Sequence, residues 1–139
     1  MKFNELGISE ELSKQMEREG ITEPTEVQVQ AIPLILKGKD VLVQSETGSG
    51  KTIGFAVPVI EQLERKSEVQ ALVITPTREL ARQVEGEFDR FISKLHSTVV
   101  YGGVSIKPQI SEVKQSDIVV GTPGRLLDLL NRGALNLSH

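Results

Sequence analysis

A chain of 139 residues is enough for one domain or part of one, and its 38% apolar and 25% charged residues are typical of a globular protein. The formal net charge of −3 excludes a general electrostatic attraction to polyanions, so a nucleic-acid contact would need a local patch or aimed backbone donors. The chain has no cysteine, which excludes disulfides and thiolate metal sites and leads us to expect a cytoplasmic location. It also has no apolar run long enough to span a membrane.

Two helices are predicted near the N-terminus. Ser9 is a good N-cap for a helix whose apolar residues recur at four-residue spacing, and Gly20 ends it. Thr25 begins a second helix, expected over 26–36 and kinked or ended by Pro33. We assign residues 1–37 to an N-terminal segment and 38–139 to the main domain.

The next segment is the most informative in the sequence. An apolar strand predicted over 41–44 leads into Ser45-Glu46-Thr47-Gly48-Ser49-Gly50-Lys51-Thr52, and a helix follows to about residue 65. Glycines 48 and 50 allow successive backbone N–H groups to point at one anion, and the helix that starts near Lys51 adds its positive end. Lys51 can reach outer phosphates and the Thr52 hydroxyl can bind Mg²⁺, although the usual pattern begins with glycine where this chain has Ser45. The segment predicts a cradle for the phosphates of a nucleotide.

Three more strands are predicted over 71–75, 98–101 and 117–121, and helices follow them near 77–95, 107–114 and 122–130. Thr77 can cap the first of these helices, and Thr122-Pro123 is a good pair of N-cap and first residue for the last one. The apolar stripe predicted for the first of these helices consists of Leu80, Val84, Phe88, Phe91 and Leu95. The strands are continuous apolar runs rather than alternating ones, which is typical of a parallel sheet with helices on both faces. The sequence therefore predicts a doubly wound α/β domain. Four polar or glycine-containing segments follow the strands, at 45–52, 76–78, 102–103 and 122–125, so we expect them to lie along the carboxyl edge of one sheet.

Taken together, these motifs resemble the first domain of the DEAD-box ATP-dependent RNA helicases over essentially the whole chain. The resemblance implies an incomplete RecA-like P-loop domain that uses ATP and Mg²⁺ and binds RNA through the sugar-phosphate backbone without reading sequence. It implies catalytic roles for Lys51 and Thr52. It implies nucleotide contacts from all of residues 45–52 and adenine contacts from Phe3, Ile21 and Gln28. The RNA-contacting residues it implies are Pro76, Thr77, Arg78, Gly102, Gly103, Thr122, Pro123, Gly124 and Arg125.

Gln28 has two interpretations. Its side-chain amide can pair with N6 and N7 of adenine, and guanine would mismatch that pattern. However, Thr25-Glu26-Val27-Gln28 also spells a helix capping box, in which the Gln28 side chain reaches back to the Thr25 N–H. The two roles do not exclude each other, because an amide has several bonding sites. Ile21 stands where the family usually has an aromatic ring, so we expect weaker packing on the base and modest nucleotide affinity.

The family's Asp-Glu-Ala-Asp segment, which binds magnesium and positions water, and its second RecA-like domain belong beyond His139. We therefore expect the isolated chain to bind ATP or ADP weakly and to hydrolyse neither. We also expect the apolar strand at 41–43 to be an unpaired edge that promotes self-association. Two alternatives remain open, namely another P-loop NTPase, such as a small-molecule kinase, and a non-catalytic module that binds nucleotide or RNA.

Overall fold

The computed structural model describes residues 1–46, 48 and 50–139, so the predicted phosphate contacts of Thr47 and Ser49 lie outside the described residues. The chain divides into two compact units, Met1–Gln62 and Leu63–His139, and each is described by itself. The predicted subdivision into an adenine-recognition segment, residues 1–37, and a partial ATP-binding domain, residues 38–139, stays a prediction.

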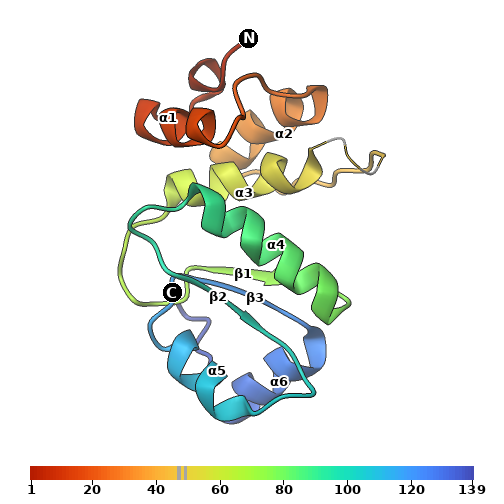
Figure 1. Ribbon diagram of the computed structural model, residues 1–139, viewed down its shortest axis with the longest axis vertical. Helices are drawn as coiled ribbons and strands as arrows, with labels where there is room; N and C mark the ends of the chain where they lie inside the picture. Colours follow the sequence, from red (N-terminus) through yellow and green to blue (C-terminus); the bar gives the residue numbers. More distant parts are fainter. Residues whose placement is uncertain (47, 49) are drawn as a thin grey trace. The chain divides into compact units, whose positions relative to one another are not determined.

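The first unit is helical. It contains the 3-10 turn η1 (Phe3–Leu6) and the helices α1 (Glu10–Arg18), α2 (Glu26–Leu36) and α3 (Lys51–Gln62). The Ser9 hydroxyl accepts a hydrogen bond of 3.2 Å from the Leu12 N–H, which confirms the predicted cap of α1. Helix α2 packs along α3, as Figure 1 shows. Pro33 lies inside α2 and does not end it.

The predicted strand at 41–44 does not form, and that prediction is wrong. Residues 41–46 have no regular structure, and the side chain of Leu42 is 95% exposed. A strand needs a hydrogen-bonded neighbour, and in the described part of the chain no strand pairs with this segment. Its apolar residues therefore lack the sheet that their pattern predicts.

The second unit is a parallel sheet covered by helices on both faces, as the sequence predicts. The strands are β1 (Ala71–Ile74), β2 (Ser97–Val100) and β3 (Ile118–Gly121), in the order β1-β3-β2. In the register, Gly121 of β3 is paired with Ile74 on one side and Val100 on the other, so the three carboxyl ends coincide. Helix α4 (Arg78–Phe91) covers one face, and α5 (Ile106–Val113) and α6 (Pro123–Asn131) cover the other (Figure 1).

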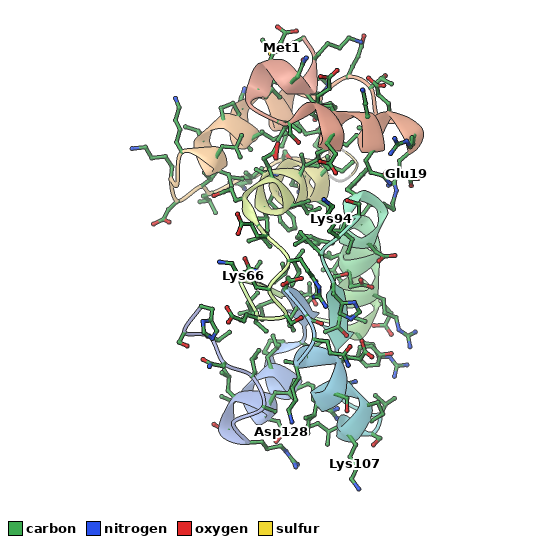
Figure 2. The ribbon with its side chains drawn as sticks, turned by 90° about the vertical axis from the view of Figure 1, so that its left-hand side faces the viewer. Met1, Glu19, Lys66, Lys94, Lys107 and Asp128 are labelled. Carbon is green, nitrogen blue, oxygen red and sulfur yellow. The ribbon has the colours of Figure 1, made fainter. Side chains whose placement is uncertain are left out.

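Each face of this sheet has its own apolar core. Val119 points to the α5 and α6 side, where it joins a cluster completed by Val69, Val100, Val113, Leu126, Leu129 and Leu135. Figure 2 shows α5 and α6, marked by Lys107 and Asp128, next to each other. On the opposite face, α4 buries Ala81, Val84, Phe88 and Phe91. This stripe differs from the predicted one: Leu80 is 39% exposed, and Leu95 lies beyond the end of the helix. Among the described residues, no helix is long and apolar enough to cross a bilayer.

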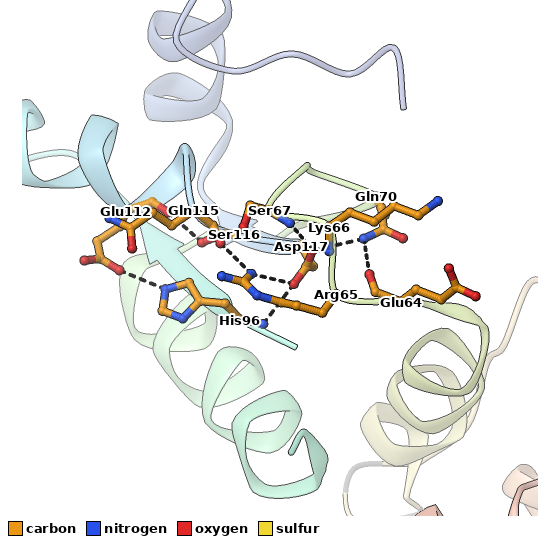
Figure 3. A network of polar contacts seen from close by, with 10 residues as sticks. All are labelled: Glu64, Arg65, Lys66, Ser67, Gln70, His96, Glu112, Gln115, Ser116 and Asp117. Carbon is orange, nitrogen blue, oxygen red and sulfur yellow. Dashed lines mark hydrogen bonds and ion pairs between the residues drawn. The ribbon is translucent and has the colours of Figure 1, made fainter. Parts of the chain in front are cut away.

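Asp117 fixes the amino ends of the strands (Figure 3). Its side chain is fully buried, and its two oxygens accept five hydrogen bonds of 2.8–3.1 Å, from Arg65 Nη1, the backbone N–H groups of Lys66, Ser67 and His96, and Gln70 Nε2. Burial by itself raises the pKa of this carboxyl, but the hydrogen bonds and the Arg65 charge hold the pKa below its ordinary value of 3.8. A buried carboxylate therefore holds the segments that precede all three strands in one register.

Candidate nucleotide and nucleic-acid sites

Both glycines of the predicted phosphate loop have a left-handed backbone. Gly48 and Gly50 have φ angles of +85° and +88°, a region that residues with a Cβ rarely adopt. Helix α3 begins at Lys51, and the Gly54 N–H donates to the Gly50 carbonyl at 2.9 Å, so the first turn starts at the end of the loop. Lys51 Nζ reaches back over six residues to the Ser45 carbonyl at 2.5 Å. The Lys51 ammonium thus lies at the start of the loop's sequence while its own residue begins α3, a helix N-terminus at which an anion is favoured.

Gln28 forms the capping box that the sequence predicts. The Thr25 N–H donates to Gln28 Oε1 at 3.0 Å, and the Gln28 N–H donates to the Thr25 hydroxyl at 3.4 Å. The side-chain amide also donates from Nε2 to the Gly50 carbonyl at 3.3 Å, which ties α2 to the phosphate loop. The side-chain Oε1 and Nε2 each use one of their two bonding sites in these contacts with described residues, so one lone pair and one N–H remain, which is the number that adenine N6 and N7 require.

The contact between Gln28 and Gly50 leaves no room for a side chain at position 50 of the loop. A Cβ on Gly50 would lie 2.5 Å from Gln28 Nε2 and 3.1 Å from the Thr25 hydroxyl. Glycine at position 50 is therefore required twice, by its positive φ and by the close approach of the Gln28 amide.

A pocket of about 350 Å³ brings Phe3 and Ile21 together, beside Thr22 and the polar face of α1. The Phe3 ring is almost fully buried and forms part of the wall, whereas Ile21 is half-buried. Gln28 does not line this pocket, because its side chain is 2% exposed and turned toward Gly50. Of the three predicted adenine contacts, the structure brings together two.

The remaining residues of the loop fit a nucleotide phosphate and its magnesium ion by their chemistry. Thr52 is the second residue of α3 and is half-buried, and its hydroxyl is an oxygen ligand of the kind Mg²⁺ prefers. Glu46 is exposed to solvent. The loop thus combines glycine-permitted N–H donors, one ammonium group and one hydroxyl.

The second unit places the other three predicted segments at the carboxyl ends of its strands. After β1, the Thr77 hydroxyl accepts from the Leu80 N–H at 3.2 Å and caps α4, as predicted. Arg78 is the first residue of that helix and lies over the Tyr101 ring, 5.3 Å from its centre. Pro76, Thr77 and Arg78 are all exposed.

After β2 come Gly102 and Gly103, both exposed, and Gly103 has a φ of +84°. A Cβ at Gly102 would meet nothing within 4 Å, and one at Gly103 would lie 3.9 Å from Arg78 Nη1. The two glycines leave the backbone open beside the Arg78 guanidinium, which suits the approach of a second chain.

After β3, Thr122 is the N-cap of α6 and Pro123 is its first residue, as the sequence predicts. The Thr122 side chain makes no capping bond, although its N–H donates to the Val100 carbonyl at 3.2 Å. Gly124 is exposed, with open space where a Cβ would be. Arg125 donates to Gln109 Oε1 at 2.8 Å and to the Val104 carbonyl at 2.9 Å.

Gln109 is a residue of this edge that the sequence reasoning missed. Its side chain is 9% exposed, and its Nε2 donates to the Tyr101 carbonyl at 3.1 Å while its Oε1 accepts from Arg125. One amide thus joins the segment after β2 to the start of α6. The signal was present in the sequence, because Gln109 interrupts the apolar stripe that Ile106, Ile110 and Val113 form on the predicted helix.

Comparisons with known proteins agree with this geometry. The DEAD/DEAH box helicase family matches residues 25–139. An ATP-dependent RNA helicase CshA of Limosilactobacillus reuteri is 48% identical over 143 residues, which cover 100% of this chain and 29% of that protein. A probable ATP-dependent RNA helicase of Methanocaldococcus jannaschii is 43% identical over 142 residues, covering 100% of this chain and 39% of that protein. The chain thus spans between about a quarter and two fifths of the length of these relatives.

Solved structures give the same result for the fold. The crystal structure of a DEAD box protein from the hyperthermophile Methanococcus jannaschii matches with a TM-score of 0.92 and 44% identity, covering 98% of this chain and 38% of that one. A hypothetical ATP-dependent RNA helicase from Sulfolobus tokodaii matches with a TM-score of 0.83 and 42% identity, covering 92% of this chain and 38% of that one. The parallel sheet and its helices are therefore those of a RecA-like domain, and the chain belongs to the DEAD/DEAH box helicase family.

Proposed function

We propose that the intact protein carrying this sequence is an ATP-dependent RNA helicase that separates or remodels RNA duplexes. The observation that carries the proposal is the shared edge of the second unit. Three strands end in register there, and each is followed by exposed groups that can bind a sugar-phosphate chain: the capped helix start at Thr77, the open glycines at 102–103 and the α6 start at Thr122. None of these groups is arranged to read a base edge, so binding is expected to be independent of sequence.

In the first unit, the chain supplies the nucleotide site. The amides of the loop and the Lys51 ammonium bind and orient phosphates, and the Thr52 hydroxyl would hold Mg²⁺. Ile21 would pack against the base from the pocket that it shares with Phe3. Gln28 would select adenine with its remaining lone pair and N–H, which requires its side chain to turn out from the buried position against Gly50. When bound, Mg²⁺–ATP supplies the phosphoryl group and the neutralising charge for hydrolysis.

Lys51 is expected to change partners when nucleotide binds. Its ammonium now bonds to the Ser45 carbonyl, a neutral acceptor. A phosphate oxygen is negatively charged and forms a stronger, charge-assisted bond, so it replaces that carbonyl. The lysine is thereby held within the loop before nucleotide arrives.

Three further features belong to the proposal. A second RecA-like domain, expected from the family resemblance, would close on the nucleotide and couple hydrolysis to bending of the RNA. The isolated 139-residue chain would bind nucleotide and hydrolyse none, and it would self-associate through the apolar segment around Leu42. The cytoplasmic location expected from the cysteine-free sequence stays a prediction.

The test is RNA-stimulated ATP hydrolysis by the intact protein, with Lys51→Ala as the variant and Lys94→Ala, an exposed lysine of the second unit, as the matched control. We expect Lys51→Ala to abolish hydrolysis and Lys94→Ala to leave it unchanged. ATP hydrolysis that no RNA stimulates, together with stoichiometric phosphorylation of a small molecule, would favour a P-loop kinase instead. Nucleotide and RNA binding without turnover would favour a non-catalytic module.

A further inference from the structure

Tyr101 contacts two arginines at the carboxyl edge of the second unit. The guanidinium carbon of Arg78 is 5.3 Å from the centre of the Tyr101 ring, and that of Arg82 is 4.9 Å from it. Arg82 also donates to the Tyr101 hydroxyl twice, from Nε at 3.2 Å and from Nη2 at 2.6 Å. The three side chains form one cluster that joins the first turns of α4 to the end of β2.

This cluster brings like charges together. Arg78 and Arg82 are four residues apart on one helix, a spacing at which like charges repel. Arg78 is also the first residue of α4, where the helix dipole disfavours a cation, and Arg82 follows one turn later. The electron-rich ring and hydroxyl of Tyr101 hold the guanidinium groups in place, but a neutral ring does not cancel their charge.

The arginines of the second unit divide into two sets by their partners. Arg65, Arg90 and Arg132 each form an ion pair with a carboxylate, and Arg90 and Arg132 lie near the far ends of α4 and α6. Arg78, Arg82 and Arg125 lie at the carboxyl edge, and in the described part of the chain their recorded partners are a tyrosine, an amide and a backbone carbonyl. These three cations are thus oriented by neutral groups, and within the described residues none of them forms an ion pair with a carboxylate.

We propose that Arg82 is an additional RNA-phosphate-binding residue and that Tyr101 is the residue that positions it. This inference rests on the proposed function. A guanidinium has five N–H donors, and the Tyr101 hydroxyl accepts from two of them, so three are left for a phosphate. The open backbone at Gly102 and Gly103 allows an RNA strand to approach beside the cluster. Arg78 and Arg82 would then contact neighbouring phosphates of one strand.

The experiment measures binding of a fluorescent single-stranded oligouridylate to the intact protein, with a non-hydrolysable ATP analogue, at several salt concentrations. Arg82→Gln is expected to weaken binding about 3- to 10-fold and to lower the slope of log K against log salt by about 0.7, the value for one lost phosphate contact on a single strand. The matched control is Arg90→Gln, on the same helix but paired with Glu87, and it should leave affinity and slope unchanged. Arg82→Lys should restore the slope and only part of the affinity.

A double-mutant cycle tests the positioning role of Tyr101. Tyr101→Phe keeps the ring and removes the hydroxyl, so it should weaken binding when Arg82 is present and have no further effect in Arg82→Gln. An equal loss in both backgrounds would overturn the positioning role. An unchanged affinity and slope in Arg82→Gln, with wild-type binding intact, would overturn this assignment alone. Failure of the wild-type protein to bind RNA would overturn the proposed function and this assignment with it.

Discussion

Replacing Asp117 by asparagine is expected to destabilise the second unit, because the five donors around this side chain all require an acceptor. Three of them point at Oδ1, and the amide oxygen of asparagine can keep these bonds. The other two, Arg65 Nη1 at 2.8 Å and the His96 N–H at 3.1 Å, point at Oδ2. In the variant an NH₂ group faces these two donors and accepts from neither.

The magnitude follows from the burial of the two donors. A buried backbone N–H that loses its acceptor costs about 1–3 kcal/mol, and this is the upper range for the part-buried His96 N–H. The Arg65 side chain is 39% exposed, so water replaces most of its lost ion pair and the loss is about 0–1 kcal/mol. We therefore expect the free energy of unfolding to fall by about 1–4 kcal/mol. Urea unfolding followed by circular dichroism would show this as a lower midpoint at an unchanged m-value.

The effect should also depend on pH in a defined direction. The folded pKa of Asp117 lies below its ordinary value of 3.8. A carboxyl whose pKa is lower in the folded state stabilises the fold fully at any pH above its unfolded pKa. This stabilisation disappears as the pH falls through the folded-state pKa. The difference in unfolding free energy between wild type and Asp117→Asn should thus be constant from about pH 5 to 8 and should narrow below about pH 4.

A control separates this network from a general loss of charge. Asp128→Asn removes the same charge from a half-exposed ion pair with Arg132 on α6 and is expected to change stability by less than about 0.5 kcal/mol. If Asp117→Asn and Asp128→Asn lowered the urea midpoint equally, or if the Asp117 effect were independent of pH down to pH 3, the reasoning would be refuted.

Three other substitutions test the sites. Gln109→Glu loses the hydrogen bond to the Tyr101 carbonyl but can still accept from Arg125 and neutralises its charge. The intact protein should then bind oligouridylate several-fold more weakly with a lower salt slope, and an unchanged slope would contradict a role for Arg125 in binding phosphate. Ile21→Phe adds a ring to the pocket beside Phe3 and should tighten ATP binding several-fold in a calorimetric titration; no tightening would argue against base packing at this position. Leu42→Lys should shift the isolated chain toward monomer in sedimentation velocity, and a wild-type chain that is monomeric at all concentrations would exclude self-association.

Local chemistry made the helix starts predictable. Ser9, Thr25 and Thr77 each cap the helix that the sequence assigns to them, because the side chain and the N–H it accepts from are three residues apart. The positive φ angles at Gly48 and Gly50 follow from residue type in the same way. The order of strands and helices in the second unit was also predicted, because continuous apolar runs that alternate with amphipathic segments favour a parallel sheet.

Contacts between distant residues were not predictable. The polar partners of Asp117 lie up to 52 residues away in the sequence, and no spacing rule connects them. The segment at 41–44 has the composition of a buried strand, but strand formation depends on a neighbouring strand that its own sequence does not supply. In α4, Leu80 and Ala81 are both compatible with the buried stripe, and packing against the sheet selects Ala81.

The predicted phosphate contacts in both units share one device. Lys51 is held by the Ser45 carbonyl, Arg125 by Gln109, and Arg82 by Tyr101, so each cation is oriented by a neutral acceptor. A carboxylate partner would orient a cation equally well but would compete with a phosphate for it, and exchange would then separate two opposite charges. When its partner is neutral, the cation exchanges a neutral acceptor for a charged phosphate oxygen. The stronger, charge-assisted bond then adds to the free energy of binding. A chain with a net charge of −3 can therefore still offer a polyanion a set of positioned cations.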